Sequence, residues 1–219
     1  MSEAVSMTRD ELSRRARMRR RIRAFLAKSY MNIISLVLLT LSAFFFLHVQ
    51  KDREATLANH PELFADNDLV TVIKVIDGDE VRIQNASGST RLRLLGIQSF
   101  DASAKDLLLA EYGKIAVDYL EAEAVSKTAK LRIAPKAIDD EGRLLGSLIL
   151  KDSGDDLAER MVENGITLVY EKYPFAQMES FLDSQQAAKN EKVGLWMSDR
   201  VRVRAESMSR LWRKERAGH

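Results

Sequence analysis

The chain has 219 residues and no cysteine, which excludes disulfides, a thiolate nucleophile and a cysteine-ligated zinc site. Its formal net charge of +2 hides a strong segregation, because residues 1–30 carry nine Lys/Arg and three Asp/Glu, residues 31–198 carry eighteen and twenty-six, and residues 199–219 carry seven and three. Two basic ends therefore flank an acidic middle. None of the three histidines lies in a ligand-spaced motif, so a histidine-based metal site is not expected.

The first predicted element is a membrane span over residues 29–50. These residues lie between Lys28 and Lys51 and carry no formal charge when His48 is neutral. As a helix they would reach roughly 33 Å, enough to cross a hydrocarbon core of about 30 Å. A buried core helix would show a polar face, and a cleavable signal peptide would have a shorter apolar region and a small-residue cleavage site. The pattern therefore predicts an uncleaved signal anchor.

The charges around this span predict its orientation. The Lys/Arg excess lies in residues 1–28, and the positive-inside rule assigns such a flank to the cytoplasm. Everything after Lys51 is then expected on the periplasmic side, held to the inner membrane by a single pass, with the lipid bilayer as one partner. Residues 51–68 are polar, contain Pro61 and are expected to form a linker.

From residue 69 the pattern becomes that of a mainly β domain. Short apolar or alternating runs bounded by Gly, Asp, Asn or Ser predict strands over residues 69–76, 80–83, 90–97, 130–134 and 144–150. Helical spacing appears over residues 107–124, 155–165 and 176–194, with Gly165 as a natural C-cap. The order of three strands, a helix, two strands and two helices predicts an α+β domain over residues 69–197, an OB-fold with a five-stranded barrel and three helices.

A basic C-terminal helix is expected within residues 198–219. Its apolar positions are Val201, Met208, Leu211 and Trp212, and six arginines lie among the other positions of residues 199–216. The segment is interpreted either as a solvated helix with one docking stripe or as an interaction tail for anionic lipid or a protein partner.

Six short motifs occur in order between residues 69 and 197. They are IKVIDGDEVRI (73–83), RLRLLGI (91–97), EYGKIAVDYL (111–120), DDEGRLLGSLIL (139–150), DLAERMVENGITLVY (156–170) and NEKVGLW (190–196). Any one of them would be weak evidence, but together they resemble the staphylococcal nuclease (thermonuclease) family. The resemblance implies an OB-fold that cleaves DNA and RNA with calcium.

The resemblance also implies the residues of the site. Arg93 and Arg143 match the two arginines that meet phosphate oxygens, a task that suits the fork of guanidinium N–H donors. Asp79 matches the first metal carboxylate, and Tyr170 and Tyr173 lie near the tyrosines that the family uses beside the nucleotide. In such a site a hard cation on oxygen ligands polarises the phosphate, and a glutamate orients or deprotonates the attacking water.

Residues 98–101 depart from the family's aspartate, threonine, proline and glutamate. Gln98 stands where the second metal carboxylate is expected, followed by Ser99 as a further metal-side residue, and the lost negative charge should weaken calcium binding. Asp101 stands for the general base and is one methylene shorter than glutamate. A misplacement of about 1 Å can cost around a hundredfold in rate.

Two functions therefore remain open from the sequence. The leading interpretation is a catalytically degenerate domain that acts as a binding or scaffold module in an envelope membrane complex, with Arg93 and Arg143 held by Asp79 and Asp101 in a structural ion-pair network. The alternative is a membrane-tethered, calcium-dependent nuclease. The acidic middle of the chain favours the first and disfavours nucleic acid as a partner, because a nuclease gains affinity from Lys/Arg that neutralise phosphates.

Overall fold

The computed structural model describes residue 18, residues 37–46 and residues 59–218, and the chain divides into two compact units, Met1–Glu54 and Ala55–His219. In the first unit, residues 37–46 form a helix whose side chains are exposed. Among the described residues, no helix is long and apolar enough to cross a membrane. The predicted span over residues 29–50 continues on both sides of this helix into residues outside the described set, so the span and its orientation stay predictions.

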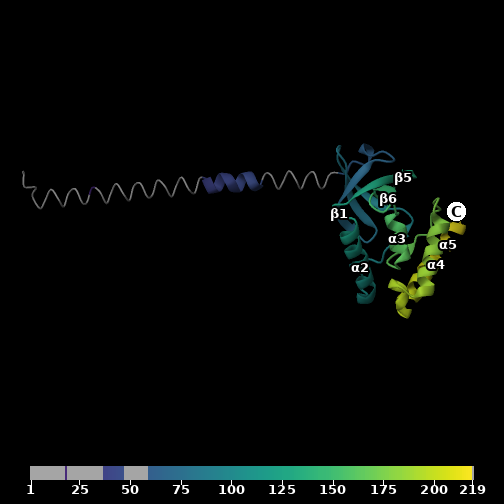
Figure 1. Ribbon diagram of the computed structural model, residues 1–219. Coiled ribbons are helices and arrows are strands. Elements are labelled where there is room, and N and C mark those ends of the chain that lie inside the picture. The colour runs from purple at the N-terminus through teal and green to yellow at the C-terminus, as the bar shows by residue number, and fades with distance from the viewer. Residues whose placement is uncertain (1–17, 19–36, 47–58, 219) are drawn as a thin grey trace, which may run out of the picture. The chain divides into compact units, whose positions relative to one another are not determined.

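The second unit is built around a closed five-stranded barrel (Figure 1). In their order around the barrel the strands are β1 (Leu69–Asp77), β2 (Glu80–Gln84), β3 (Ser89–Leu94), β6 (Leu144–Leu150) and β5 (Thr128–Ile138). Neighbouring strands pair antiparallel except β3 and β6, which meet in parallel and close the barrel. The five-stranded barrel predicted from the sequence is confirmed, and with its helices it fits the OB-type fold.

The expected third strand is divided by a turn at Gly96. β3 ends at Leu94 because Gly96 has a φ of +81°, and a Cβ there would lie 2.5 Å from the Phe175 ring. The next two residues form β4 (Ile97–Gln98), which pairs with β7 (Leu168–Val169) in a separate two-stranded sheet. The apolar run continues through the turn, so the sequence showed one strand where the structure has two.

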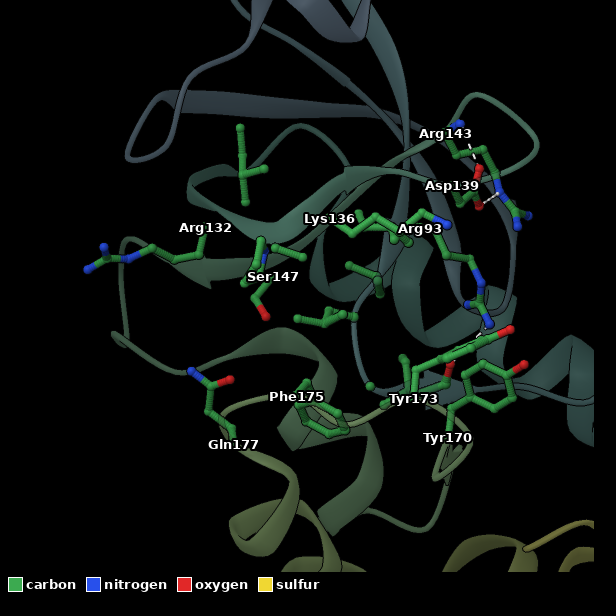
Figure 2. A pocket seen from close by; sticks show the side chains of 18 of the residues that line it. Arg93, Arg132, Lys136, Asp139, Arg143, Ser147, Tyr170, Tyr173, Phe175 and Gln177 are labelled. Carbon is green, nitrogen blue, oxygen red and sulfur yellow. Dashed lines mark hydrogen bonds and ion pairs between the residues drawn. The ribbon is translucent and has the colours of Figure 1, made fainter. Parts of the chain in front are cut away.

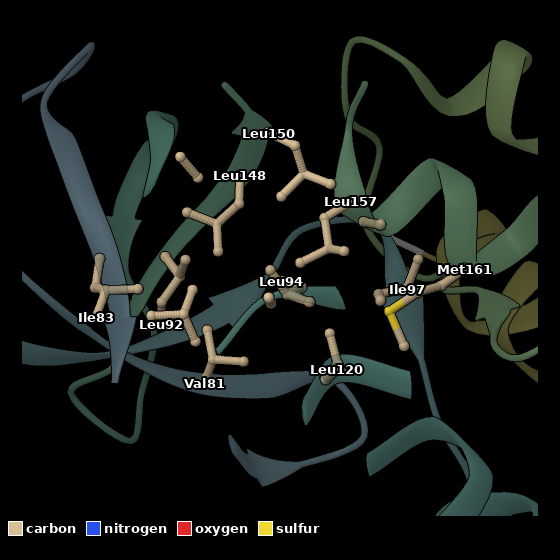
Figure 3. Packing of buried hydrophobic residues seen from close by; sticks show 14 of the residues in the cluster. Val81, Ile83, Leu92, Leu94, Ile97, Leu120, Leu148, Leu150, Leu157 and Met161 are labelled. Carbon is tan, nitrogen blue, oxygen red and sulfur yellow. The ribbon is translucent and has the colours of Figure 1, made fainter. Parts of the chain in front are cut away.

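One hydrophobic core fills the barrel and the helix interface (Figure 3). Alternate residues of β2, β3 and β6 point inward, and helices α2 (Leu107–Glu123) and α3 (Leu157–Glu163) pack against the barrel and add residues to its core. The fully buried members include Ile83, Leu92, Leu94, Leu120, Leu148, Leu157 and Met161. Full burial of such a side chain contributes about 1.5–3 kcal/mol.

Asp residues fix where α2 and α3 begin, and this positions the core-facing sides of both helices. The side chain of Asp106 accepts from Leu108 N–H, and that of Asp156 accepts from Ala158 N–H. Helix α4 (Met178–Glu191) then packs against α3. The three predicted helices are confirmed, although each is shorter than predicted.

The end of the predicted linker and the C-terminal helix both belong to the second unit. A short 3-10 helix, η1 (Pro61–Leu63), precedes Phe64, which is buried in the barrel core. At the other end, η2 (Gly194–Met197) leads into α5 (Asp199–Ala217), which buries Val201 and Trp212 in a second hydrophobic cluster. Leu211, expected on the docking stripe, is instead 53% exposed, because it lies about 100° around the helix from Trp212.

Candidate functional site

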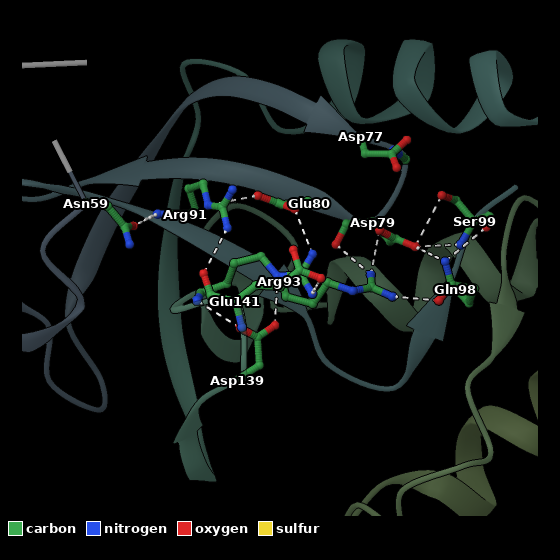
Figure 4. Close-up of polar contacts among 12 residues, drawn as sticks. Asn59, Asp77, Asp79, Glu80, Arg91, Arg93, Gln98, Ser99, Asp139 and Glu141 are labelled. Carbon is green, nitrogen blue, oxygen red and sulfur yellow. Dashed lines mark hydrogen bonds and ion pairs between the residues drawn. The ribbon is translucent and has the colours of Figure 1, made fainter. Parts of the chain in front are cut away.

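Arg93 lies near the end of β3, with its side chain only 11% exposed. Its Nη1 forms an ion pair with Asp79 Oδ1 at 2.6 Å and donates to the Asp79 carbonyl oxygen at 3.0 Å. Its Nη2 donates to the Ile97 carbonyl oxygen at 3.0 Å. The same Nη2 donates to Gln98 Oε1, also at 3.0 Å (Figure 4). Both terminal nitrogens of the guanidinium are therefore occupied by acceptors from the chain itself.

Gln98 bridges the two charged partners. Its Nε2 donates to Asp79 Oδ2 at 3.1 Å while its Oε1 accepts from Arg93. Ser99 donates to the same Oδ2 through its N–H at 2.7 Å and its Oγ at 3.2 Å. An ionised carboxylate at position 98 could accept from Arg93 but could not donate to Asp79. The neutral amide thus completes the network of Arg93 and Asp79 without a metal ion.

The turn formed by Asp77 and Gly78 sets Asp79 in this position. Gly78 N–H donates to Asp77 Oδ1 at 2.8 Å. A Cβ at Gly78 would lie 2.6 Å from the Ala116 Cβ and 2.7 Å from the Ser99 Cβ, so only glycine permits this close approach of α2 and Ser99. Burial is the main cause that raises the pKa of Asp77, opposed by the Gly78 hydrogen bond. Asp77 and Gly78 thus form the turn between β1 and β2.

Asp101, the expected general base, is hydrogen-bonded within its own loop. Its exposed Oδ1 accepts from the N–H and the Oγ of Ser103, both at 2.7 Å. The side-chain and then the backbone hydrogen bond from Ser103 lower the pKa of Asp101. A lower pKa makes a weaker base. The predicted ion-pair network is therefore present for Arg93 with Asp79, whereas Asp101 contacts Ser103.

Arg143 lies in the turn before β6 and is surrounded by three carboxylates. Its Nε is 2.7 Å from Asp139 Oδ2, its Nη1 is 3.0 Å from Glu80 Oε2, and its Nη2 is 3.3 Å from Glu141 Oε1. Burial by itself raises the pKa of Asp139, but the hydrogen bonds and the charge of Arg143 outweigh it, so the pKa is lowered. The second guanidinium is thus also neutralised by the chain.

Glu80 and Asp139 both hold Arg143, and neither contact was predicted from the sequence. The Glu80 side chain is buried and also contacts Arg91, with Oε1 3.4 Å from the Arg91 Nε. A local signal for Asp139 did exist, since an aspartate four residues before an arginine and three before Gly142 is typical of a side-chain-stabilised turn. The contact of Glu80 with Arg143 spans 63 positions and has no local signal.

A groove of about 1020 Å³ opens beside these networks (Figure 2). Arg93, Gln98 and Arg143 line it, and Tyr170 and Tyr173 form another part of its wall. Figure 2 shows the Arg93 guanidinium directed toward the two tyrosine rings. The structure therefore brings five of the predicted site residues to one groove, whereas Asp79, Ser99 and Asp101 are not among its lining residues.

The side chains of Asp79 and Gln98, as they are arranged, do not fit a calcium ion. Calcium takes about six to eight oxygen ligands, but both Asp79 side-chain oxygens already accept from N–H or O–H donors or pair with Arg93. The Gln98 oxygen is likewise used by Arg93. Within the part of the chain that the structure describes, no three His, Asp or Glu side chains form a group able to hold a metal.

Comparison with known proteins identifies the family of this chain. Residues 91–198 match the family described as staphylococcal nuclease homologue. Two Escherichia coli proteins, each named "Uncharacterized endonuclease", are 30% identical over 125 residues, which cover 57% of this chain and 74% of theirs. "Endonuclease YhcR" of Bacillus subtilis is 30% identical over 139 residues, which cover 57% of this chain and 11% of that protein. The chain therefore belongs to the family of staphylococcal nuclease homologues.

Proposed function

We propose that this chain is a membrane-anchored, catalytically degenerate member of the family that serves as a binding module in an envelope membrane complex. The observation that carries the proposal is the Gln98 bridge. It lets Asp79 and Arg93 satisfy each other without a metal ion. The groups that would bind calcium and phosphate are therefore used to hold the fold.

Phosphodiester hydrolysis needs free guanidinium donors at the phosphate and a base that reaches the attacking water. To meet a phosphate, Arg93 would have to leave Asp79, and the buried Asp79 carboxylate would then need another positive partner. The base is also compromised, because Asp101 is shorter than glutamate and its carboxylate is held by Ser103. Both requirements of the chemistry are therefore opposed by contacts within the chain.

The anchor in this proposal is the uncharged segment of residues 29–50. Its described part, residues 37–46, is a helix in which Leu38, Leu39, Phe44 and Phe45 are 62–71% exposed. Such an apolar surface is unfavourable in water and favourable in hydrocarbon. The basic residues 1–28 favour a cytoplasmic N-terminus, so we propose the periplasmic side for the nuclease-like domain, with the bilayer and membrane proteins as partners.

A membrane-tethered, calcium-dependent nuclease is the second candidate. One observation favours it: the groove brings Arg93 and Arg143 together with Tyr170 in a space large enough for a nucleotide, and relatives of the chain are named endonucleases. This function would require both arginines to be released from their carboxylates.

A cleavage assay on the full chain in detergent separates the two functions. We expect fluorescently labelled single-stranded DNA to be cut no faster in millimolar calcium than by an Arg93→Ala variant purified in parallel. Cleavage that requires calcium, stops with a chelator and is abolished by Arg93→Ala would refute the degenerate-site proposal and favour the nuclease.

A further inference from the structure

The last two turns of α5 lie against the tyrosine side of the groove, although the family match ends at residue 198. Residues 170–173, here called the tyrosine wall, follow the two-residue strand β7, and residues 170–177 form neither helix nor strand. The wall is tied to the barrel where it begins, by Tyr170 N–H donating to the Gly96 carbonyl oxygen at 2.8 Å. Beyond Tyr170, the tyrosine wall is held by side-chain contacts with α5.

An aromatic chain leads from α5 into the groove. Trp212 is buried, and its ring lies 5.0 Å from that of Tyr170 at an interplanar angle of 87°. The Tyr170 ring in turn lies 5.9 Å from that of Tyr173, at 73°. Both pairs have the edge-to-face geometry that aromatic rings favour. Tyr173 lines the groove. Its orientation is thus linked to Trp212 through Tyr170.

Two ion pairs run parallel to this aromatic chain. Arg213 Nη1 lies 2.9 Å and 3.2 Å from the two carboxylate oxygens of Glu171, which is only 2% exposed. Glu215 lies 3.1 Å from Lys172 Nζ, and that ammonium group is 5.5 Å from the Tyr173 ring centroid. Three successive wall residues are therefore each held by one residue near the end of α5.

We propose that the end of α5, through Trp212, Arg213 and Glu215, is a positioning element of the groove that fixes the tyrosine wall beside Arg93. The buried Glu171 supports this role, because a carboxylate at that depth needs a charged partner and Arg213 supplies one. The inference rests on the groove that the proposed function uses for binding. Its test requires neither cleavage nor a bound nucleic acid, so the two can fail separately.

The test uses fluorine NMR of the full chain with 3-fluorotyrosine, each signal being assigned by a Tyr→Phe substitution. Tyr173 is the reporter because its ring packs on Tyr170, which in turn packs on Trp212. Tyr119 on α2 is the internal reference. Trp212→Leu keeps an apolar side chain in the second cluster, and Arg213→Met keeps the aliphatic stem. Both should shift the Tyr173 signal toward that of the free amino acid and narrow it at least twofold, while Tyr119 stays unchanged.

Conservative variants separate positioning from general stability. Trp212→Phe and Arg213→Lys should return the Tyr173 signal toward the wild-type position, because an aromatic edge or a cation is retained. Leu211→Ala, in the same helical turn but 53% exposed, should leave it unchanged. An unaltered Tyr173 signal in both Trp212→Leu and Arg213→Met would overturn the proposal. So would equal changes at Tyr173 and Tyr119, because α5 would then act only through the stability of the whole unit.

Discussion

Replacing Gln98 by aspartate should make the stability of this domain depend on a divalent cation. The Gln98 Nε2 lies 3.1 Å from Asp79 Oδ2, and its Oε1 lies 3.0 Å from Arg93 Nη2. Gln98→Asp removes the donor, keeps an acceptor and adds a negative charge beside a buried carboxylate. The variant is therefore expected to be less stable than the wild type in the absence of calcium.

The magnitude follows from these contacts. A hydrogen bond to a charged group contributes about 1.5–3 kcal/mol. Two carboxylates about 4 Å apart repel by about 4 kcal/mol at an effective dielectric constant of about 20, and a similar attraction to Arg93 largely offsets this. The free energy of unfolding should then fall by about 2 kcal/mol, which for a unit of this length lowers the Tm by roughly 4–8 °C.

Calcium should reverse this loss in the variant alone. A ligand present at about one hundred times its Kd stabilises the folded state by about 2.7 kcal/mol, which is enough to return the variant to the wild-type Tm. The measurement is a thermal melt of the full chain followed by circular dichroism, in chelator and in millimolar calcium. Gln84→Asp, at the exposed end of β2, is the matched control for added charge. A wild-type Tm that rises with calcium as much as that of Gln98→Asp would refute the reasoning.

Adding Asp101→Glu to Gln98→Asp should recover measurable calcium-dependent cleavage of single-stranded DNA, and either change alone should recover little, because metal charge and base reach act on the same transition state. A double variant that binds calcium without cutting would contradict this. Asp139→Asn should reduce the free energy of unfolding most at neutral pH. The pKa of Asp139 is lower in the folded protein than in the unfolded chain. Its ionised form therefore gives stability that is present above about pH 3.9 and is lost as the pH falls through the pKa of the folded state. Urea titrations showing the same difference at pH 7 and pH 3 would exclude that linkage. Protease added to spheroplasts should remove the nuclease-like domain, and its protection behind an intact inner membrane would argue against the predicted orientation.

The barrel could be predicted because its strands carry their own signals. Runs such as residues 69–76 and 144–150 alternate or stay apolar between turn residues, and the structure forms strands at both positions. The division at Gly96 could not be predicted in this way, since the apolar run continues on both sides of the turn. The sequence could not show whether Leu211 or Trp212 packs against the protein, because the second hydrophobic cluster that contacts Trp212 forms only when the chain folds.

The site could be predicted in its residues but not in its connections. The motifs indicated Arg93, Arg143 and the departure at Gln98, all of which line the groove. That Gln98 donates to Asp79 while accepting from Arg93 requires three residues from different parts of the chain to meet at fixed angles. The partner of Asp101 is local, yet a serine two residues away has many possible roles in a loop, so this contact was not foreseen.

The arginines of this site also have a mechanical role that does not need a substrate. The parallel pairing of β3 with β6, which closes the barrel, covers only residues 92–94 and 144–146. Glu80 on β2 contacts Arg91 on β3 and Arg143 just before β6, so one buried carboxylate connects three strands at the closure. Arg93 similarly ties the end of β3 to β4 through its bonds to Ile97 and Gln98. Selection for a closed barrel would retain these arginines with or without catalysis, so their presence in a family member is weaker evidence for activity than the residue at position 98.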